Sequence, residues 1–110
     1  MEILQVPFTS INWEEIPGTK HPGETGLATW RTVEKGNLRV RLVEYSPGYL
    51  ADHWCAMGHV IHILKGEMVS ELKDGSKSYL KHGMTYMMSN DPENPHRTYT
   101  DTGVILFIVD

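Results

Sequence analysis

The sequence has little cysteine and no long hydrophobic run: Cys55 is the one cysteine in 110 residues. A single cysteine excludes an internal disulfide and favours a reducing compartment. The longest apolar run, Val104 to Val109, is far shorter than the roughly 18 residues that a membrane-spanning helix needs. The N-terminus has neither a basic leader nor an apolar stretch of signal-peptide length. We therefore expect a soluble cytoplasmic protein with no membrane partner.

Positive charge is also scarce. Ten Lys and Arg side chains stand against fourteen Asp and Glu, which gives a formal net charge of -4. The basic residues are scattered along the chain rather than gathered into a stripe, and this distribution argues against contacts with a phosphate backbone. The length fits one domain with one core and is too short for two. We predict a single domain with no nucleic-acid partner.

Helical patterning is almost absent. Asn12 and Glu15 resemble a capping box, but Pro17-Gly18 ends the helix at once. From residue 27 onward, turn residues separate short segments rich in β-branched and aromatic side chains. The nine predicted strands are 27–34, 38–45, 51–55, 59–64, 67–73, 77–81, 84–88, 96–100 and 104–109. The pattern predicts an all-β sandwich or closed barrel over 27–110, preceded by a short irregular or helical arm, 1–26, that packs on it.

Two predicted strands differ in how their faces should be covered. Segment 38–45 alternates Leu38, Val40 and Leu42 on one face with Arg39, Arg41 and Val43 on the other. One of these faces should be core. Segment 104–109 is apolar at every position, which is typical of a strand covered on both faces, inside a barrel or against a second subunit. We therefore expect a homodimer.

The strongest chemical signal is a group of three histidines and the cysteine within residues 48–62. The four residues are His53, Cys55, His59 and His62. Imidazole nitrogen and thiolate sulfur are the donors that borderline transition metals prefer. On an extended strand His53 and Cys55 would share a face, whereas His62, three residues after His59, would point to the opposite face. We predict metal binding by His53, Cys55 and His59, and a structural role for His62.

These residues resemble the first motif of the cupin barrels, which runs Gly, His-x-His, Glu, Gly. The matching positions are Gly48, His53, Cys55, His59 and Gly66. Cys55 stands where the second His is expected, and His59 stands where the Glu is expected. Both replacements are themselves competent metal ligands. By this resemblance, all three ligand positions of the motif carry residues that can bind a metal.

A looser version of the second cupin motif begins at Gly83 and reaches His96. Ser89 and Asp91 replace its Pro and Gly, and Thr100 replaces its Asn. The order Asp-His-Trp-Cys at 52–55, together with the segments around 26–32 and 106–110, is similar to the small single-domain cupins named for a DHCW motif. This likeness spans nearly the whole chain. It implies an RmlC-like jelly-roll barrel and adds His96 to the ligand set, but it brings no established reaction.

The resemblance and the residues together imply a His3Cys site formed by His53, Cys55, His59 and His96. Such donors suit a divalent transition metal such as Zn, Fe, Ni or Cu and do not choose among them. The leading hypothesis is a small metal-binding cupin of unassigned activity. Two alternatives stay open: a metal-dependent oxygenase or isomerase acting on a small organic acid, and a non-catalytic module that binds or senses a small ligand.

Four further residues are predicted to line the cavity of such a barrel: Trp30, Arg39, Arg41 and Tyr86. The two arginines could meet an anionic ligand there, even in a barrel without metal. Simple exposure of one strand face explains them equally well. The aromatic residues are also well suited to the core. His21 and His82 fall in a loop and a turn, and neither is a ligand candidate.

Overall fold

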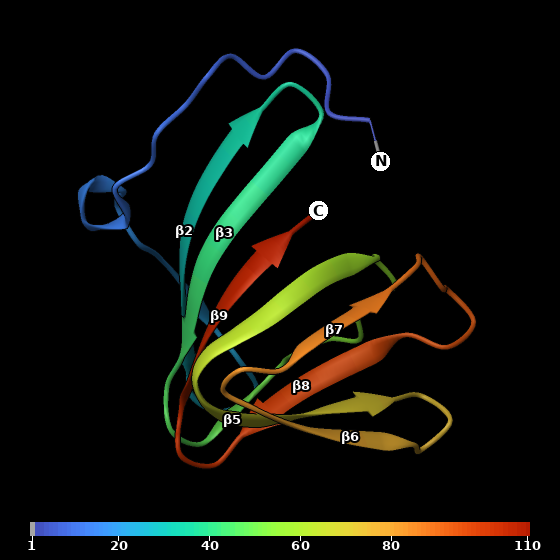
Figure 1. Ribbon diagram of the computed structural model, residues 1–110. Helices are drawn as coiled ribbons and strands as arrows, with labels where there is room; N and C mark the ends of the chain where they lie inside the picture. Colours follow the sequence, from blue (N-terminus) through green and yellow to red (C-terminus); the bar gives the residue numbers. More distant parts are fainter. Residues whose placement is uncertain (1) are drawn as a thin grey trace.

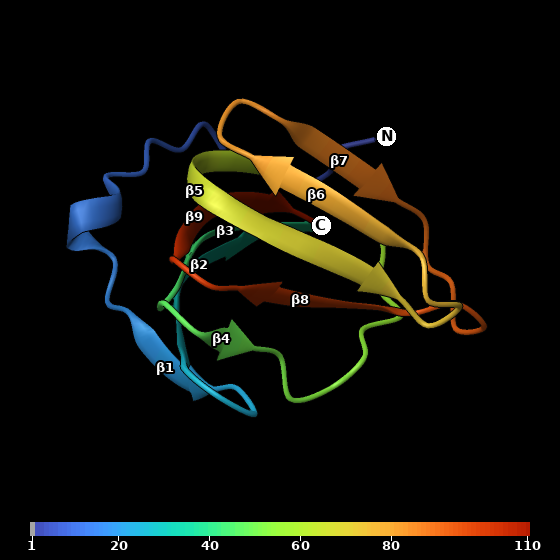
Figure 2. The same cartoon turned by 90° about the horizontal axis from the view of Figure 1, so that it is seen from below.

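Nine strands form one strongly curled sheet in the computed structural model, which describes residues 2–110 (Figure 1). They are β1 (Thr19–Pro22), β2 (Leu27–Lys35), β3 (Leu38–Tyr45), β4 (Tyr49–Leu50), β5 (His59–Leu72), β6 (Lys77–Lys81), β7 (Thr85–Met88), β8 (His96–Thr100) and β9 (Val104–Val109). The strand order is β1-β2-β3-β9-β5-β8-β4, and β6 and β7 also pair with β5. Viewed from below, the sheet curls into an open barrel (Figure 2). The all-β prediction is confirmed.

Strand β5 joins the two halves of the barrel and was predicted as two strands. Its first part pairs with β7 and β9, and its second part pairs with β6 and β8. The register shifts between Ile63 and Lys65, and Gly66 follows with a φ of 84°. A bulge of this kind bends a strand without ending its pairing. The turn signal at Lys65-Gly66 therefore marks a bend and not a break.

Four strands, β3, β6, β8 and β9, have the predicted boundaries, but two predictions were wrong. Segment 51–55 is not a strand, because the chain bends at Asp52 and His53 and returns to the sheet only through an isolated bridge between Cys55 and His96. The arm is not wholly irregular. Its residues Thr19–Pro22 form β1, which pairs antiparallel with β2 and extends the sheet.

The core lies on the concave side of the sheet, and Val43, Ile63 and Leu106 are fully buried there. Strand β3 turns its arginine-bearing face inward: Arg41 and Val43 are buried, whereas Leu42 on the opposite face is only half-buried. Hydrophobic alternation alone would have placed the arginines outside. An ion pair, described below, accounts for their inward position.

The segment before β1 covers part of the convex side. A short 3₁₀ helix at Trp13–Glu15 begins after Asn12, whose side chain accepts a hydrogen bond from the Glu14 amide. The ring of Trp13 meets that of Phe107 edge-on, with 6.3 Å between their centroids. Within the described residues, no helix is long and apolar enough to cross a membrane.

Candidate metal centre

Cys55, His59 and His96 bring three metal-competent donor atoms together inside the barrel. Their donor atoms all lie within 4.8 Å of one another. The Cys55 Sγ is 3.6 Å from Nε2 of His59, and the rings of His59 and His96 meet edge-on with centroids 5.3 Å apart. Both histidines are buried and Cys55 is half-buried. The cluster is therefore compact enough for one metal ion.

Each ligand candidate is held by a different part of the chain. His59 begins β5 and His96 begins β8, and Cys55 lies in the loop between β4 and β5. The Cys55 amide donates to the His96 carbonyl at 2.7 Å, and the His96 amide donates to the Cys55 carbonyl at 2.9 Å. This two-bond bridge fixes the thiol beside β8 although the loop has no regular strand. The donors are thus held in place by backbone contacts.

Asp110 orients His59 and was missed by sequence reasoning. The Nδ1 of His59 donates to Oδ2 of Asp110 at 2.7 Å, which leaves Nε2 as the nitrogen that faces Cys55. Metal-binding histidines commonly give their second nitrogen to a carboxylate in this way. No motif pointed to Asp110. The pairing of β9 with β5 and β3 brings it beside the cluster, where its backbone exchanges two hydrogen bonds with Arg39.

The same carboxylate is paired with two arginines of β3. Arg39 donates to it from Nε at 2.7 Å and from Nη2 at 2.9 Å, and Arg41 donates from Nη2 at 2.9 Å. Burial favours the neutral acid, but the hydrogen bonds from Arg39 and His59 outweigh it and lower the pKa of Asp110 to about 2. Asp110 is therefore ionised at any physiological pH.

The thiol is also shifted toward its ionised form. Hydrogen bonds from His59 and then from His96 lower the pKa of Cys55 to about 5, against an opposing effect of burial. Burial by itself would lower the pKa of His59, yet its bonds to Cys55 and Asp110 raise it above the ordinary value. Thiolate is the form of cysteine that binds metal. The cluster thus holds Cys55 in the ionised form that a metal would bind.

The structure does not bring His53 into this cluster. Its side chain is 72% exposed, and Nδ1 lies 2.7 Å from Oδ1 of Asp52. The expected shared face with Cys55 is wrong because that segment is not a strand. His53 does line the cavity beside the cluster, so its role as a ligand stays a prediction. His62 is bonded through Nδ1 to Thr85 at 2.7 Å and lies outside the group.

The cluster opens onto a cavity of about 200 Å³ in the barrel. Trp30, Arg39, Arg41 and Tyr86, the four residues predicted to line such a cavity, are all on its wall. The Arg41 guanidinium carbon lies 4.9 Å from the centre of the Trp30 ring. A favourable cation–π contact therefore accompanies the ion pair with Asp110.

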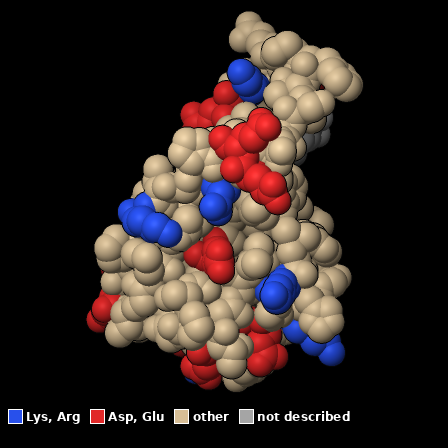
Figure 3. Space-filling model, turned by 90° about the vertical axis from the view of Figure 1, so that its left-hand side faces the viewer, with Lys and Arg blue, Asp and Glu red and all other residues tan. Residues whose placement is uncertain are grey.

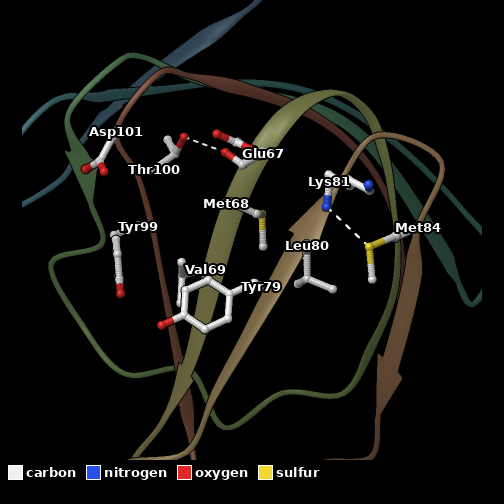
Figure 4. A pocket seen from close by; sticks show the side chains of 10 residues that line it. All are labelled: Glu67, Met68, Val69, Tyr79, Leu80, Lys81, Met84, Tyr99, Thr100 and Asp101. Atoms are coloured by element: carbon white, nitrogen blue, oxygen red, sulfur yellow. Dashed lines mark hydrogen bonds between the residues drawn. The ribbon is translucent and has the colours of Figure 1, made fainter.

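A second hollow, of about 320 Å³, lies around β5, β6 and β8 (Figure 4). Its wall includes Met68, Leu80 and the exposed Tyr79. Two of its polar groups already have partners, since Thr100 Oγ1 donates to the carbonyl of Glu67 at 2.6 Å and the Lys81 amide contacts the Met84 sulfur. It holds none of the three clustered donors, so the chemistry is concentrated in the first cavity.

Comparison with known proteins shows similarity in structure but not in sequence. No family model matches the chain, and no curated protein sequence matches it. A solved cupin-like protein from Thermotoga maritima aligns with a TM-score of 0.72 at 17% identity, over 84% of this chain and 76% of that one. Ectoine synthase from P. lautus aligns with a TM-score of 0.73 at 15% identity, over 93% of this chain and 76% of that one. Fe(II)-HppE, solved with an alternative substrate, aligns with a TM-score of 0.75 at 14% identity, over 94% of this chain and 60% of that one. The TM-scores establish a common fold, and at identities this low the comparison establishes the fold alone.

Proposed function

Because this chain has the cupin fold, we propose that it binds one divalent transition metal through Cys55, His59 and His96, with His53 as a fourth ligand. The observation that carries the proposal is the convergence of one thiol and two imidazoles within 4.8 Å, from three separate segments. The finer likeness to the DHCW group of cupins remains a prediction.

The chemistry of the donor set fits such a metal. Thiolate and imidazole suit Zn, Fe, Ni or Cu, whereas Ca and Mg take oxygen ligands. The low pKa of Cys55 supplies an ionised sulfur at neutral pH. The bond from His59 to Asp110 directs Nε2 toward the sulfur. These contacts resemble the supporting interactions found around bound metals.

His53 is the proposed fourth ligand because it lies on the wall of the same cavity and little holds it elsewhere. Its partner Asp52 is exposed, and exposed ion pairs contribute little to stability. Rotation of the His53 side chain away from Asp52 should therefore be inexpensive. We expect this residue to strengthen a site that the other three ligands already form.

Elemental analysis of tag-free protein tests the proposal. We expect about one metal per chain in the parent protein, and loss of that metal in Cys55→Ser and His96→Ala. His62→Ala is the matched control, because this histidine is on the same strand as His59 but outside the cluster, and it should retain the metal. His53→Ala should retain the stoichiometry with weaker affinity. A parent protein that stays metal-free after incubation with Zn²⁺ and Fe²⁺, or equal loss in His62→Ala, would contradict the site.

A second candidate function is a metal-dependent enzyme of the oxygenase or isomerase type. It is favoured by the cavity, since catalytic metal sites keep a position open beside space for a substrate. A bound metal would supply Lewis-acid polarisation of a substrate oxygen. Two structurally similar proteins, ectoine synthase and Fe(II)-HppE, have names or substrates that mark them as enzymes. Substrate turnover abolished by chelation would favour this function, whereas stabilisation by a ligand without turnover would favour a binding module.

A further inference from the structure

The cavity wall carries arginines but no carboxylate. Arg39, Arg41 and Arg97 all line it, and among the described lining residues there is no Asp or Glu. Arg97 is paired outside the cavity, where its Nη2 donates to Oε1 of Glu71 at 2.9 Å. Arg39 and Arg41 share the single carboxylate of Asp110, which is not on the wall. Asp110 is thus shared between two guanidinium groups, so neither arginine has a carboxylate to itself, although the ionised thiol of Cys55 also lies on the wall.

Arg41 also has unused hydrogen-bonding capacity. The residue is only 6% exposed, and its Nη2 donates to Asp110. Its Nε is buried and has no hydrogen-bond partner among the described residues, and the same holds for Nε of Arg97, whose Nη2 is bonded to Glu71. A buried donor without a partner costs stability and calls for an explanation. A ligand in the cavity could supply a counter-charge and acceptor oxygens for this guanidinium.

We propose that the cavity binds a small organic carboxylate, whose carboxyl group is held by Arg41 with help from Arg39. The proposal rests on the proposed function in that this anion would lie in the same cavity as the metal. The arginine subsite itself belongs to the protein and is testable without metal.

Charge and shape favour this ligand over other anions. A planar carboxylate matches the planar guanidinium group of Arg41. It also brings less negative charge beside the ionised Cys55 than a phosphate, which carries about -1.5 to -2 at neutral pH. The wall also includes Ile61, Ile108 and the ring of Trp30, which suit a carbon skeleton rather than an inorganic ion. About 200 Å³ is below the range of roughly 300–1,000 Å³ that is usual for drug-sized ligands. The ligand should therefore be a small acid.

Propionate is a suitable probe, with neutral propionamide and inorganic phosphate as comparisons. Ligand-observed NMR would give each Kd for the metal-free and the zinc-loaded protein. We expect the metal-free parent to bind propionate, and to bind propionamide and phosphate at least about tenfold more weakly, since a charge-assisted pair is lost or mismatched. Equal binding of propionamide would overturn the proposal, and so would tighter binding of phosphate.

Two variants test whether Arg41 binds the propionate carboxylate. Arg41→Lys keeps the charge next to Asp110, and with it the fold, but removes the planar fork, so propionate should bind about tenfold more weakly. Arg31→Lys is the matched control, because Arg31 lies on the neighbouring strand β2 and is not among the described residues of the cavity wall, and this variant should bind as the parent does. Equal weakening in both variants would overturn the proposal. Propionate binding that requires zinc and ignores Arg41→Lys would overturn it and leave the proposed metal site intact. Propionate binding in a protein that never takes up metal would support the subsite and contradict the metal site.

Discussion

At the residue scale, Asp110 has two roles that can be separated by measurement. It pairs with Arg39 and Arg41, and it orients His59. Asp110→Asn should lower the free energy of unfolding of the metal-free protein by about 3 kcal/mol, because it leaves buried guanidinium groups without a counter-charge. Metal affinity should fall about 10- to 100-fold, the usual effect of removing a carboxylate behind a ligating histidine. Urea unfolding and competition with a metal indicator would measure the two effects.

Asp52→Asn is the control for that pair of measurements. Asp52 also bonds a histidine that is a ligand candidate, but both partners are exposed. The stability of this variant should therefore be unchanged within error. An Asp110→Asn protein as stable as the parent would contradict the described ion-pair network.

Cys55 should ionise at unusually low pH in the metal-free protein. Its pKa is lowered to about 5, first by His59 and then by His96. The pH profile of alkylation by iodoacetamide should therefore have its midpoint near 5, and His59→Gln should move it up toward the ordinary thiol value. The sign for stability follows from linkage: a pKa lower in the folded state gives stability that is present above the unfolded pKa and lost as the pH falls through about 5. A midpoint near the ordinary value in the parent would contradict the cluster.

The sequence predicted the three clustered donors better than their surroundings. Cys55, His59 and His96 were recognisable because their spacing resembles a known motif. Asp110 was not, since only the tertiary pairing of β9 with β5 and β3 brings it near His59. The inward position of Arg41 was one of two interpretations that the sequence left open, because alternation shows that the two faces of a strand differ but not which face is buried.

At the element scale, turn chemistry placed most strand boundaries correctly and failed where tertiary contacts decide. Strands β3, β6, β8 and β9 lie between clear turn signals and begin and end as predicted. Segment 51–55 has the composition of a strand, but only its two ends bond to β8, through the Ala51 amide to the Thr98 carbonyl and through the Cys55–His96 bridge. Because this segment bends at Asp52 and His53 and does not form a strand, His53 lies outside the cluster. Strand composition therefore predicted less about the site than the spacing of its donors did.

The bend in β5 depends on Gly66, and its replacement tests that element. Gly66 has a φ of 84°, and a Cβ there would collide with the carbonyl oxygen of Gly103. Gly66→Ala should destabilise the protein by about 3 kcal/mol, because backbone strain and a steric clash add. Gly75→Ala is the matched control: its φ is 94°, but a Cβ would meet nothing within 4 Å. It should cost about 1 kcal/mol. Equal losses in urea unfolding would contradict the close approach of β5 to Gly103.

At the scale of the whole molecule, the convex side of the sheet carries an apolar row that crosses five strands. Strand register aligns Met87, Val60, Val109, Val40 and Val33. Met87 is 72% exposed and Val60 is 37% exposed, so the row is open at the β7 end. On the face shown in Figure 3, the Lys and Arg side chains are separate from one another and have Asp and Glu side chains beside and between them. An apolar row of this kind is a candidate for contact between subunits.

The predicted homodimer should use this row, because a two-fold axis lets the same apolar patch cover itself on both copies. Met87→Lys would place a charge in that contact, and sedimentation equilibrium should show the parent as a dimer and this variant as a monomer. Tyr79→Lys is the matched control, since Tyr79 is equally exposed at 72% but lies on β6, away from the row. It should remain dimeric. A monomeric parent at all concentrations would contradict the dimer, and dissociation by Tyr79→Lys alone would move the contact to the β6 side of the barrel.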